Sequence, residues 1–320
     1  MKRRSAIFAL FLAVCLLLSA CGQNGAMEKA AALREAGDYA AAMEKYMTAA
    51  DKGNAEALAR IGLMYMYGEG VDIDYDLAWE YCEKALSGGY PQAALSLGYM
   101  CEMAYGREQD PEAAIAYYTT AAEAGSATAC ENLARIYLFG LYGEFDYEKA
   151  YNYLMTAYEN GSPEMAIYIS YIYQYGLGRE VDYAAAMEWS KIGADAGSVD
   201  AMNQIAVMYS LGQGVDQSDE EAIKWYEKAA ALGSGTAMNN LGNYYEIGVC
   251  FEQDFAKAKE YYERAVEAGE PFGYASLGGL YENGHGVKKD LEMAAEYYRL
   301  AIENGRVEAQ QYLDALGLSD

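Results

Sequence analysis

Few side chains in this chain have the type and spacing that catalysis requires. The only histidine, His285, stands between two glycines, where sister segments of the chain hold glutamate, tyrosine, leucine, glutamine or valine. A general base must keep its ionisable side chain, so we interpret His285 as a loop residue. The sequence also lacks G-x-S-x-G, H-E-x-x-H and phosphate-loop motifs. We therefore expect no enzyme activity, no catalytic residue, no metal and no cofactor.

The N-terminal segment places one cysteine in a distinct chemical context. Residues 2–4 are basic and precede an apolar run over residues 6–18. This run is too short for a stable membrane span and is typical of a secretory signal. Leu18-Ser19-Ala20-Cys21 then resembles a bacterial lipobox, in which the cysteine is lipid-modified and becomes the mature N-terminus. Cleavage that leaves Cys21 as a free thiol is the alternative.

We accordingly interpret residues 1–20 as a lipoprotein signal peptide and residues 21–26 as the lipidated N-terminus with a short tether. A lipobox implies several acyl chains, and several chains hold a membrane firmly where a single one does not. The expected location is the cell envelope outside the cytoplasm, at the outer surface of the plasma membrane or at the outer membrane. The N-terminal lipid is the only membrane contact that we expect.

The rest of the chain is organised by a repeat. Glycine recurs every 36 residues without a slip, at Gly53, Gly89, Gly125, Gly161, Gly197, Gly233, Gly269 and Gly305. A fixed period of this length indicates a solenoid, in which each unit buries its apolar face only when a neighbour stacks on it.

Each repeat contains two stripes of apolar residues at helical spacing. A small residue stands nine positions past each glycine and directly follows an aliphatic one, as in Leu97-Gly98 and Leu241-Gly242. In six repeats an aromatic residue follows three positions after the small one. An alanine and a ring recur further on, as at Ala222 and Trp225. Spacings of three and four predict two amphipathic helices, which we call helix A and helix B.

The stretch between the two helices has the residues of a helix end followed by a helix start. Glycine pairs such as Gly212-Gln213-Gly214 suit a left-handed C-terminal cap of helix A. Aspartate, or serine in one repeat, recurs where helix B should begin, where its side chain can accept a hydrogen bond from a free N–H group. These positions are Asp74, Asp110, Asp146, Asp182, Ser218, Asp254 and Asp290.

This pattern resembles the Sel-one-like repeats, relatives of the tetratricopeptide repeats, over residues 53 to about 305. The resemblance lies in the succession A-x-x-x-L-G-x-x-Y, G-x-G-V-x-x-D and A-x-x-W/Y-Y-x-x-A-A. It implies an all-α fold, a right-handed α-solenoid of antiparallel helix pairs with a concave inner face. Two repeats depart from the glycine motif, with Ala104-Tyr105-Gly106-Arg107 and Gly140-Leu141-Tyr142-Gly143.

The two ends of the repeat array carry candidate caps. Residues 27–52 are similar to the second half of an ordinary tetratricopeptide unit, and we interpret them as the N-terminal cap. Seven repeats then occupy residues 53–304. Residues 305–320 repeat the opening of helix A and are expected to form a C-terminal capping helix over the last apolar face.

The four remaining cysteines do not follow the repeat. They are Cys82, Cys101, Cys130 and Cys250. An even number in an exported chain is compatible with disulfides, and a Cys82–Cys101 bridge between adjacent repeats stays open. We interpret Cys101 and Cys130 as small buried hydrophobic residues.

The net charge excludes one class of partner. Without the basic residues 2–4, 20 basic residues stand against 48 acidic ones. Nucleic-acid binding depends on clustered lysine and arginine, so no nucleic-acid partner is expected. The acidity is interpreted as a solvated outer surface, with attraction for a cationic partner as the alternative.

In the tetratricopeptide relatives, ligands lie along the concave face on helix A positions that the core does not use. These positions here lie six, ten and thirteen residues past each glycine. They are aliphatic or aromatic in the first repeats, as at Ala59, Leu63, Met66 and Leu95, and amide or acidic in later ones. The predicted partner-binding residues are Tyr99, Arg135, Tyr171, Gln174, Asn203, Asn239, Asn243 and Glu246.

The asparagines of this set lie on adjacent helices. Amides donate and accept, so the row could bind an extended peptide backbone; the alternative is that these asparagines only solvate a helix face. The sequence therefore predicts a noncatalytic, lipid-anchored scaffold that binds protein or peptide partners of basic or polar-aromatic character in its groove. An envelope enzyme acting on cell-wall or β-lactam-like substrates, to which some secreted relatives have been linked, is the competing hypothesis. A spacer with an inert groove is a third.

Overall fold

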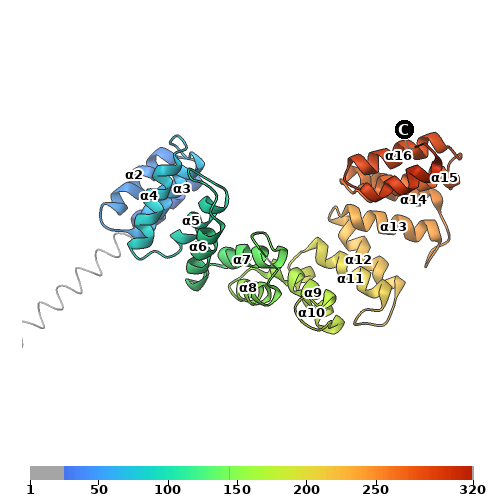
Figure 1. The fold of residues 1–320 in the computed structure, drawn as a ribbon, viewed down its shortest axis with the longest axis horizontal. Coiled ribbons are helices and arrows are strands. Elements are labelled where there is room, and N and C mark those ends of the chain that lie inside the picture. The colour runs from blue at the N-terminus through green and yellow to red at the C-terminus, as the bar shows by residue number, and fades with distance from the viewer. Residues whose placement is uncertain (1–24, 144, 319–320) are drawn as a thin grey trace, which may run out of the picture. The chain divides into compact units, whose positions relative to one another are not determined.

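The structure is a computed structural model that describes residues 25–143 and 145–318. Within these residues the regular elements are α-helices and two short 3-10 helices, without strands. They form two compact units, one ending at Ser162 and the other beginning at Pro163. Each unit is built from helical hairpins that pack on the next hairpin along the chain (Figure 1). The prediction of an all-α solenoid is confirmed.

The N-terminal unit begins with a helix over residues 25–35 and α2 (Tyr39–Ala50). Three hairpins follow, each a helix A and a helix B. They are α3 (Ala55–Tyr67) with α4 (Tyr75–Ser87), α5 (Ala93–Glu102) with α6 (Pro111–Glu123), and α7 (Ala127–Phe139) with α8 (Tyr147–Glu159).

The C-terminal unit contains four hairpins and a terminal helix. Its first hairpin starts with the 3-10 turn η1 (Pro163–Met165). The hairpins are α9 (Ala166–Tyr175) with α10 (Tyr183–Asp195), α11 (Val199–Leu211) with α12 (Asp219–Ala231), α13 (Gly235–Ile247) with α14 (Phe255–Glu267), and α15 (Pro271–Asn283) with α16 (Leu291–Glu303). The turn η2 (Val307–Ala309) and α17 (Gln310–Leu316) then pack against α16.

The helix ends follow the cap chemistry expected from the sequence. At all seven helix B starts, the aspartate or serine side chain accepts a hydrogen bond from a backbone N–H in the first turn. Gly68 ends α3 in the left-handed region, with φ 71°. Ala104 takes the same conformation in the second repeat, with φ 58°, although its side chain disfavours it.

In three hairpins the small residue of helix A is a glycine that lies beneath a tyrosine ring of helix B. A Cβ atom on Gly98 would lie 2.7 Å from the Tyr118 ring, and one on Gly278 would lie 2.6 Å from the Tyr298 ring. Real Cβ atoms do not approach rings this closely. The glycines therefore let the tyrosine rings lie flat on helix A, which fixes where their hydroxyl groups emerge.

The cysteines of the described residues are free thiols. Cys101 and Cys130 are buried, which agrees with their interpretation as small hydrophobic residues, and Cys82 is buried as well. Burial raises the pKa of the Cys82 thiol to about 11. Cys250 is exposed.

None of the helices within residues 25–143 and 145–318 has the length and apolar character of a membrane span. The predicted signal peptide and Cys21 lie outside the described residues.

Candidate functional site

A groove of about 520 Å³ lies on the helix A face of the N-terminal unit. Its apolar floor includes Leu63, Met66 and Leu95, from α3 and α5. Three tyrosines surround this floor, namely Tyr67, Tyr90 and Tyr99. Because aliphatic and aromatic side chains dominate its lining, we call this surface the aromatic groove.

The polar side of the aromatic groove carries side chains with free hydrogen-bonding capacity. Gln92, Thr128 and Asn132 line it from the start of α5 and from α7. These three side chains make no hydrogen bond to any residue that the structure describes. A ligand in the groove therefore meets an apolar floor and amide or hydroxyl groups that are available to it.

The lining repeats itself along the groove with the period of the sequence. Leu63 and Tyr99 occupy one repeat position, and Arg60, Ser96 and Asn132 occupy another. The first position belongs to the predicted helix A series. The second lies seven residues past the glycine and was missed, although it falls on the same helical stripe, between the positions at six and ten.

Arg60 is the one charged residue that lines the aromatic groove. Its guanidinium donates to Glu56 one turn earlier, at 3.0 Å. No carboxylate lines the groove, although the chain has 48 acidic residues. The lining itself therefore offers no carboxylate to a basic ligand, and the charge of Arg60 is balanced by Glu56.

Glu102, the last residue of α5, is the centre of a polar network in the same unit. It is 6% exposed and accepts hydrogen bonds from the hydroxyls of Tyr118 at 2.6 Å and Tyr142 at 3.2 Å. Arg135 of α7 donates to its second oxygen. Burial alone would raise the pKa of Glu102, but the hydrogen bonds from Tyr118 and Arg135 outweigh it and hold that pKa below its ordinary value. Arg135, a predicted groove residue, is thus engaged within the fold, with its side chain 43% exposed.

In the C-terminal unit the predicted amides connect neighbouring repeats. Asn203 donates to the Ser234 hydroxyl at 2.8 Å, and Asn239 accepts from the Ser276 hydroxyl at 2.9 Å. Gln174 is buried and donates to Gln213 at 2.9 Å. Each of these amides therefore already has a partner across a repeat boundary, although Asn203 Oδ1 is buried without one among the described residues.

Tyr171, also in the C-terminal unit, lies on α9 beside the rings of Tyr168 and Tyr175. Burial raises its pKa to about 12. Its hydroxyl therefore stays protonated at neutral pH and can act as a hydrogen-bond donor.

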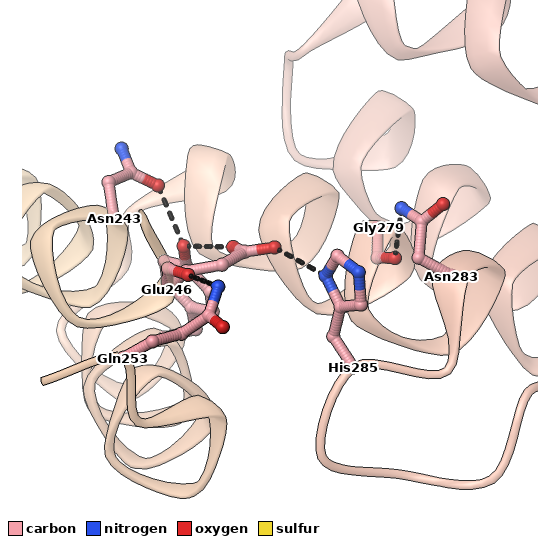
Figure 2. A network of polar contacts seen from close by, with 7 residues as sticks. Asn243, Glu246, Gln253, Gly279, Asn283 and His285 are labelled. Carbon is pink, nitrogen blue, oxygen red and sulfur yellow. Dashed lines mark hydrogen bonds and ion pairs between the residues drawn. The ribbon is translucent and has the colours of Figure 1, made fainter. Parts of the chain in front are cut away.

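Asn243 and Glu246 come together around Tyr262 in the C-terminal unit. The Tyr262 hydroxyl lies 2.7 Å from Asn243 Oδ1 and 2.7 Å from Glu246 Oε2. Figure 2 shows the Glu246 side chain reaching across to His285, whose Nδ1 lies 3.1 Å from Glu246 Oε1. The His285 ring also stacks on Phe255, with 4.5 Å between ring centroids.

This histidine–carboxylate contact joins one repeat to the loop of the next. His285 lies 39 residues after Glu246, which is one period plus three, and the same spacing joins Gln174 to Gln213. That spacing is the sequence signal that could have found the contact. Nearby, Gln253 donates to the Glu246 carbonyl and Asn283 to the Gly279 carbonyl (Figure 2).

The model of the Sel1 repeat family matches seven consecutive segments, residues 55–90, 91–126, 127–162, 163–198, 199–234, 235–270 and 271–305. The chain belongs to the Sel1 repeat family. No curated protein matches it.

Two solved structures resemble this Sel1 repeat chain over most of its length. A protective antigen of uropathogenic Escherichia coli strains, which displays an SLR fold, is 31% identical, with a TM-score of 0.73 over 86% of this chain. The match covers 59% of that chain, so the present chain spans less than two thirds of it. A Sel1 repeat protein from Oxalobacter formigenes is 26% identical, with a TM-score of 0.70 over 91% of this chain and 90% of its own.

Sel1 repeats generally form noncatalytic scaffolds for protein–protein interaction. Among the residues that the structure describes, no group of three histidine, cysteine, aspartate or glutamate side chains is placed to hold a metal ion. Of the predicted groove residues, Tyr99 lines the aromatic groove, whereas most of the others make contacts within the fold.

Proposed function

We propose that this Sel1 repeat chain is an extracytoplasmic, lipid-anchored scaffold that binds a peptide segment of a partner protein in the aromatic groove. The observation that carries the proposal is the groove itself. It combines an apolar floor with Gln92, Thr128 and Asn132, whose side chains have no hydrogen-bond partner among the described residues. Peptide recognition needs both pockets for apolar side chains and polar groups for the backbone.

A groove substitution tests the binding role directly. Tyr67 is 55% exposed at the end of α3, so Tyr67→Ala removes groove surface with little effect on packing. Tyr175 occupies the same repeat position at the end of α9 and is 64% exposed. Tyr175→Ala is therefore a matched control.

The experiment uses a photo-crosslinking aromatic residue at position 67 or 175 in intact cells, followed by identification of the attached protein. We expect one partner to be captured from position 67, and Tyr99→Ala to abolish this capture without changing the amount of protein. Equal capture from both positions, or capture that survives Tyr99→Ala, would show that the partner does not bind in the aromatic groove.

The predicted address rests on Cys21 and the apolar segment before it. Acyl chains on this cysteine would hold the solenoid at a membrane surface, because several chains together resist dissociation. Cys21→Ser should move the protein from the membrane fraction to the soluble fraction and remove the mass of the lipid. Unchanged membrane association of this variant would rule out the lipid anchor.

A further inference from the structure

Resting on the proposed function, we infer that the occupant of the aromatic groove is an uncharged, proline-rich segment in the polyproline II conformation, with an apolar side chain at every third residue.

The lining of the aromatic groove is periodic. Leu63 and Tyr99 are one repeat apart, as are Arg60, Ser96 and Asn132. The helices that carry them, α3 and α5, are in direct contact, and packed helix axes lie about 8–10 Å apart. A ligand that uses equivalent positions in successive repeats must therefore present equivalent groups at about this spacing.

Polyproline II matches this spacing. It has three residues per turn and a rise of about 3.1 Å, so the same face recurs after about 9.3 Å. A β-strand presents the same face after about 6.8 Å and would fall out of register within one repeat. Successive apolar side chains of the polyproline II segment can thus meet Leu63 and Tyr99 in turn.

The polar side of the groove favours a backbone with free carbonyl groups. The Arg60 guanidinium and the Asn132 amide are hydrogen-bond donors that line the groove. They stand one repeat before and one repeat after Ser96. Polyproline II has no internal hydrogen bonds, so its carbonyls can accept from them. An α-helical ligand satisfies its own backbone and would leave Gln92, Thr128 and Asn132 unused.

Aromatic side chains complete the match. Tyr67, Tyr90 and Tyr99 line the groove, and aromatic-lined grooves accommodate the preformed, low-entropy polyproline II helix. Proline also lacks an N–H group, so it brings no donor that the apolar floor at Leu63 and Met66 would leave unsatisfied.

Charge complementarity restricts the ligand further. No carboxylate lines the groove, and its one cation, Arg60, is paired with Glu56. A basic side chain of the ligand would find no unpaired carboxylate on the lining to offset its desolvation, and an acidic one would have to displace Glu56 and approach a chain of net charge −25. An uncharged segment encounters neither cost, so its affinity should depend little on salt.

The test uses synthetic peptides and the mature full chain. The probe is a capped peptide of three Leu-Pro-Pro units, and the comparison is a capped isomer of the same composition with its leucines adjacent. Isothermal titration should show the periodic peptide to bind at least about tenfold more tightly than the isomer. Raising the ionic strength from about 0.01 M to about 0.15 M should change its Kd by less than about twofold.

The matched variants locate the binding. Tyr67→Ala should weaken the periodic peptide by about fivefold or more, whereas Tyr175→Ala should leave its Kd unchanged. Equal affinity for the isomer, or binding that is insensitive to Tyr67→Ala, would overturn the inference. If a partner is crosslinked at position 67 through a segment without proline, the inference fails and the proposed function stands. If position 67 captures no partner, both fail.

Discussion

The hydroxyl of Tyr298 donates a 2.6 Å hydrogen bond to Glu282, sixteen residues earlier on the facing helix of the same hairpin. The same spacing joins Tyr118 to Glu102 and Tyr262 to Glu246. In each of these repeats the small residue beneath the ring is glycine, which lets the tyrosine lie against helix A. The carboxylate, the ring and the glycine therefore belong together as one structural set.

Repeats without this set carry different but matched residues. In the third repeat, Leu138 and Leu154 stand at the positions of Glu102 and Tyr118, and both are buried. In the next repeat, Ser170 and Ser190 are in hydrogen-bond contact at 2.7 Å, close to Gln174 and Gln204. The backbone thus repeats with one period, whereas the side chains between the two helices of a hairpin differ between repeats. They are a carboxylate with a tyrosine in some repeats, two leucines in another, and serines with glutamines in a third.

Removal of a single hydroxyl tests the importance of the buried pair. Tyr118→Phe deletes a donor to Glu102, which is 6% exposed and cannot recover the bond fully from water. We expect a loss of about 1–3 kcal/mol in the free energy of unfolding, measured by urea denaturation. Tyr298→Phe is the control and should cost less, because Glu282 is only partly buried. Equal losses in the two variants would contradict this explanation.

The pKa of Glu102 makes a prediction about acid. Because this pKa is lower in the folded state than its ordinary value of 4.5, the ionised carboxylate contributes stability that is complete above pH 4.5. That contribution falls as the pH drops from 4.5 through the folded-state pKa. The stability difference between the wild type and Glu102→Gln should therefore be constant near neutral pH and should shrink below pH 4.5. A stability difference that grows below pH 4.5 would contradict a lowered pKa of Glu102 in the folded state.

Two adjacent glycines of α15 should respond in opposite directions to alanine. A Cβ on Gly278 would lie 2.6 Å from the Tyr298 ring, whereas one on Gly279 would have its nearest neighbour at 4.0 Å. Gly278→Ala should reduce the free energy of unfolding by about 1–3 kcal/mol, because the ring must shift. Gly279→Ala should raise it by about 0.5–1 kcal/mol, because alanine favours a helix interior. Thermal or urea denaturation measures both, and a loss of stability in Gly279→Ala would contradict the open space beside Gly279.

The fold was predictable because its determinants are local and repeated. The 36-residue glycine period, the aspartate caps such as Asp74 and the small residue at Gly98 each predict a helix end or a close contact from nearby sequence. The aromatic groove was partly predictable for the same reason. Leu63 and Tyr99 occupy the helix A positions that the repeat period predicted for the groove, and they line it.

The partners of polar side chains were not predictable from one repeat alone. Asn203 and Asn239 read as free amides, yet each meets a serine of the next repeat. His285 read as an isolated loop residue, yet it contacts Glu246 one period and three residues earlier. Such contacts depend on how neighbouring hairpins are offset, which is a property of the stacked structure rather than of the local sequence pattern.

The left-handed residue Ala104 provides a test of strain in a glycine loop. Its φ of 58° matches the conformation that Gly68 adopts at the end of α3. An alanine in this region costs about 1–2 kcal/mol, and glycine also gains about 0.4–1 kcal/mol of unfolded-state entropy. Ala104→Gly should therefore raise the free energy of unfolding by about 0.5–1 kcal/mol, since the first effect exceeds the second.

The control for this substitution is Ala124→Gly at the end of α6, where φ is −86° and no strain is relieved. This variant should lose stability, by at least about 0.4–1 kcal/mol, because glycine raises the entropy of the unfolded state and removes a half-buried methyl group. Cys250, with φ 62°, occupies a second strained position, so Cys250→Gly should behave like Ala104→Gly. If all three variants lost stability to the same extent, the positive φ angles of Ala104 and Cys250 would carry no strain.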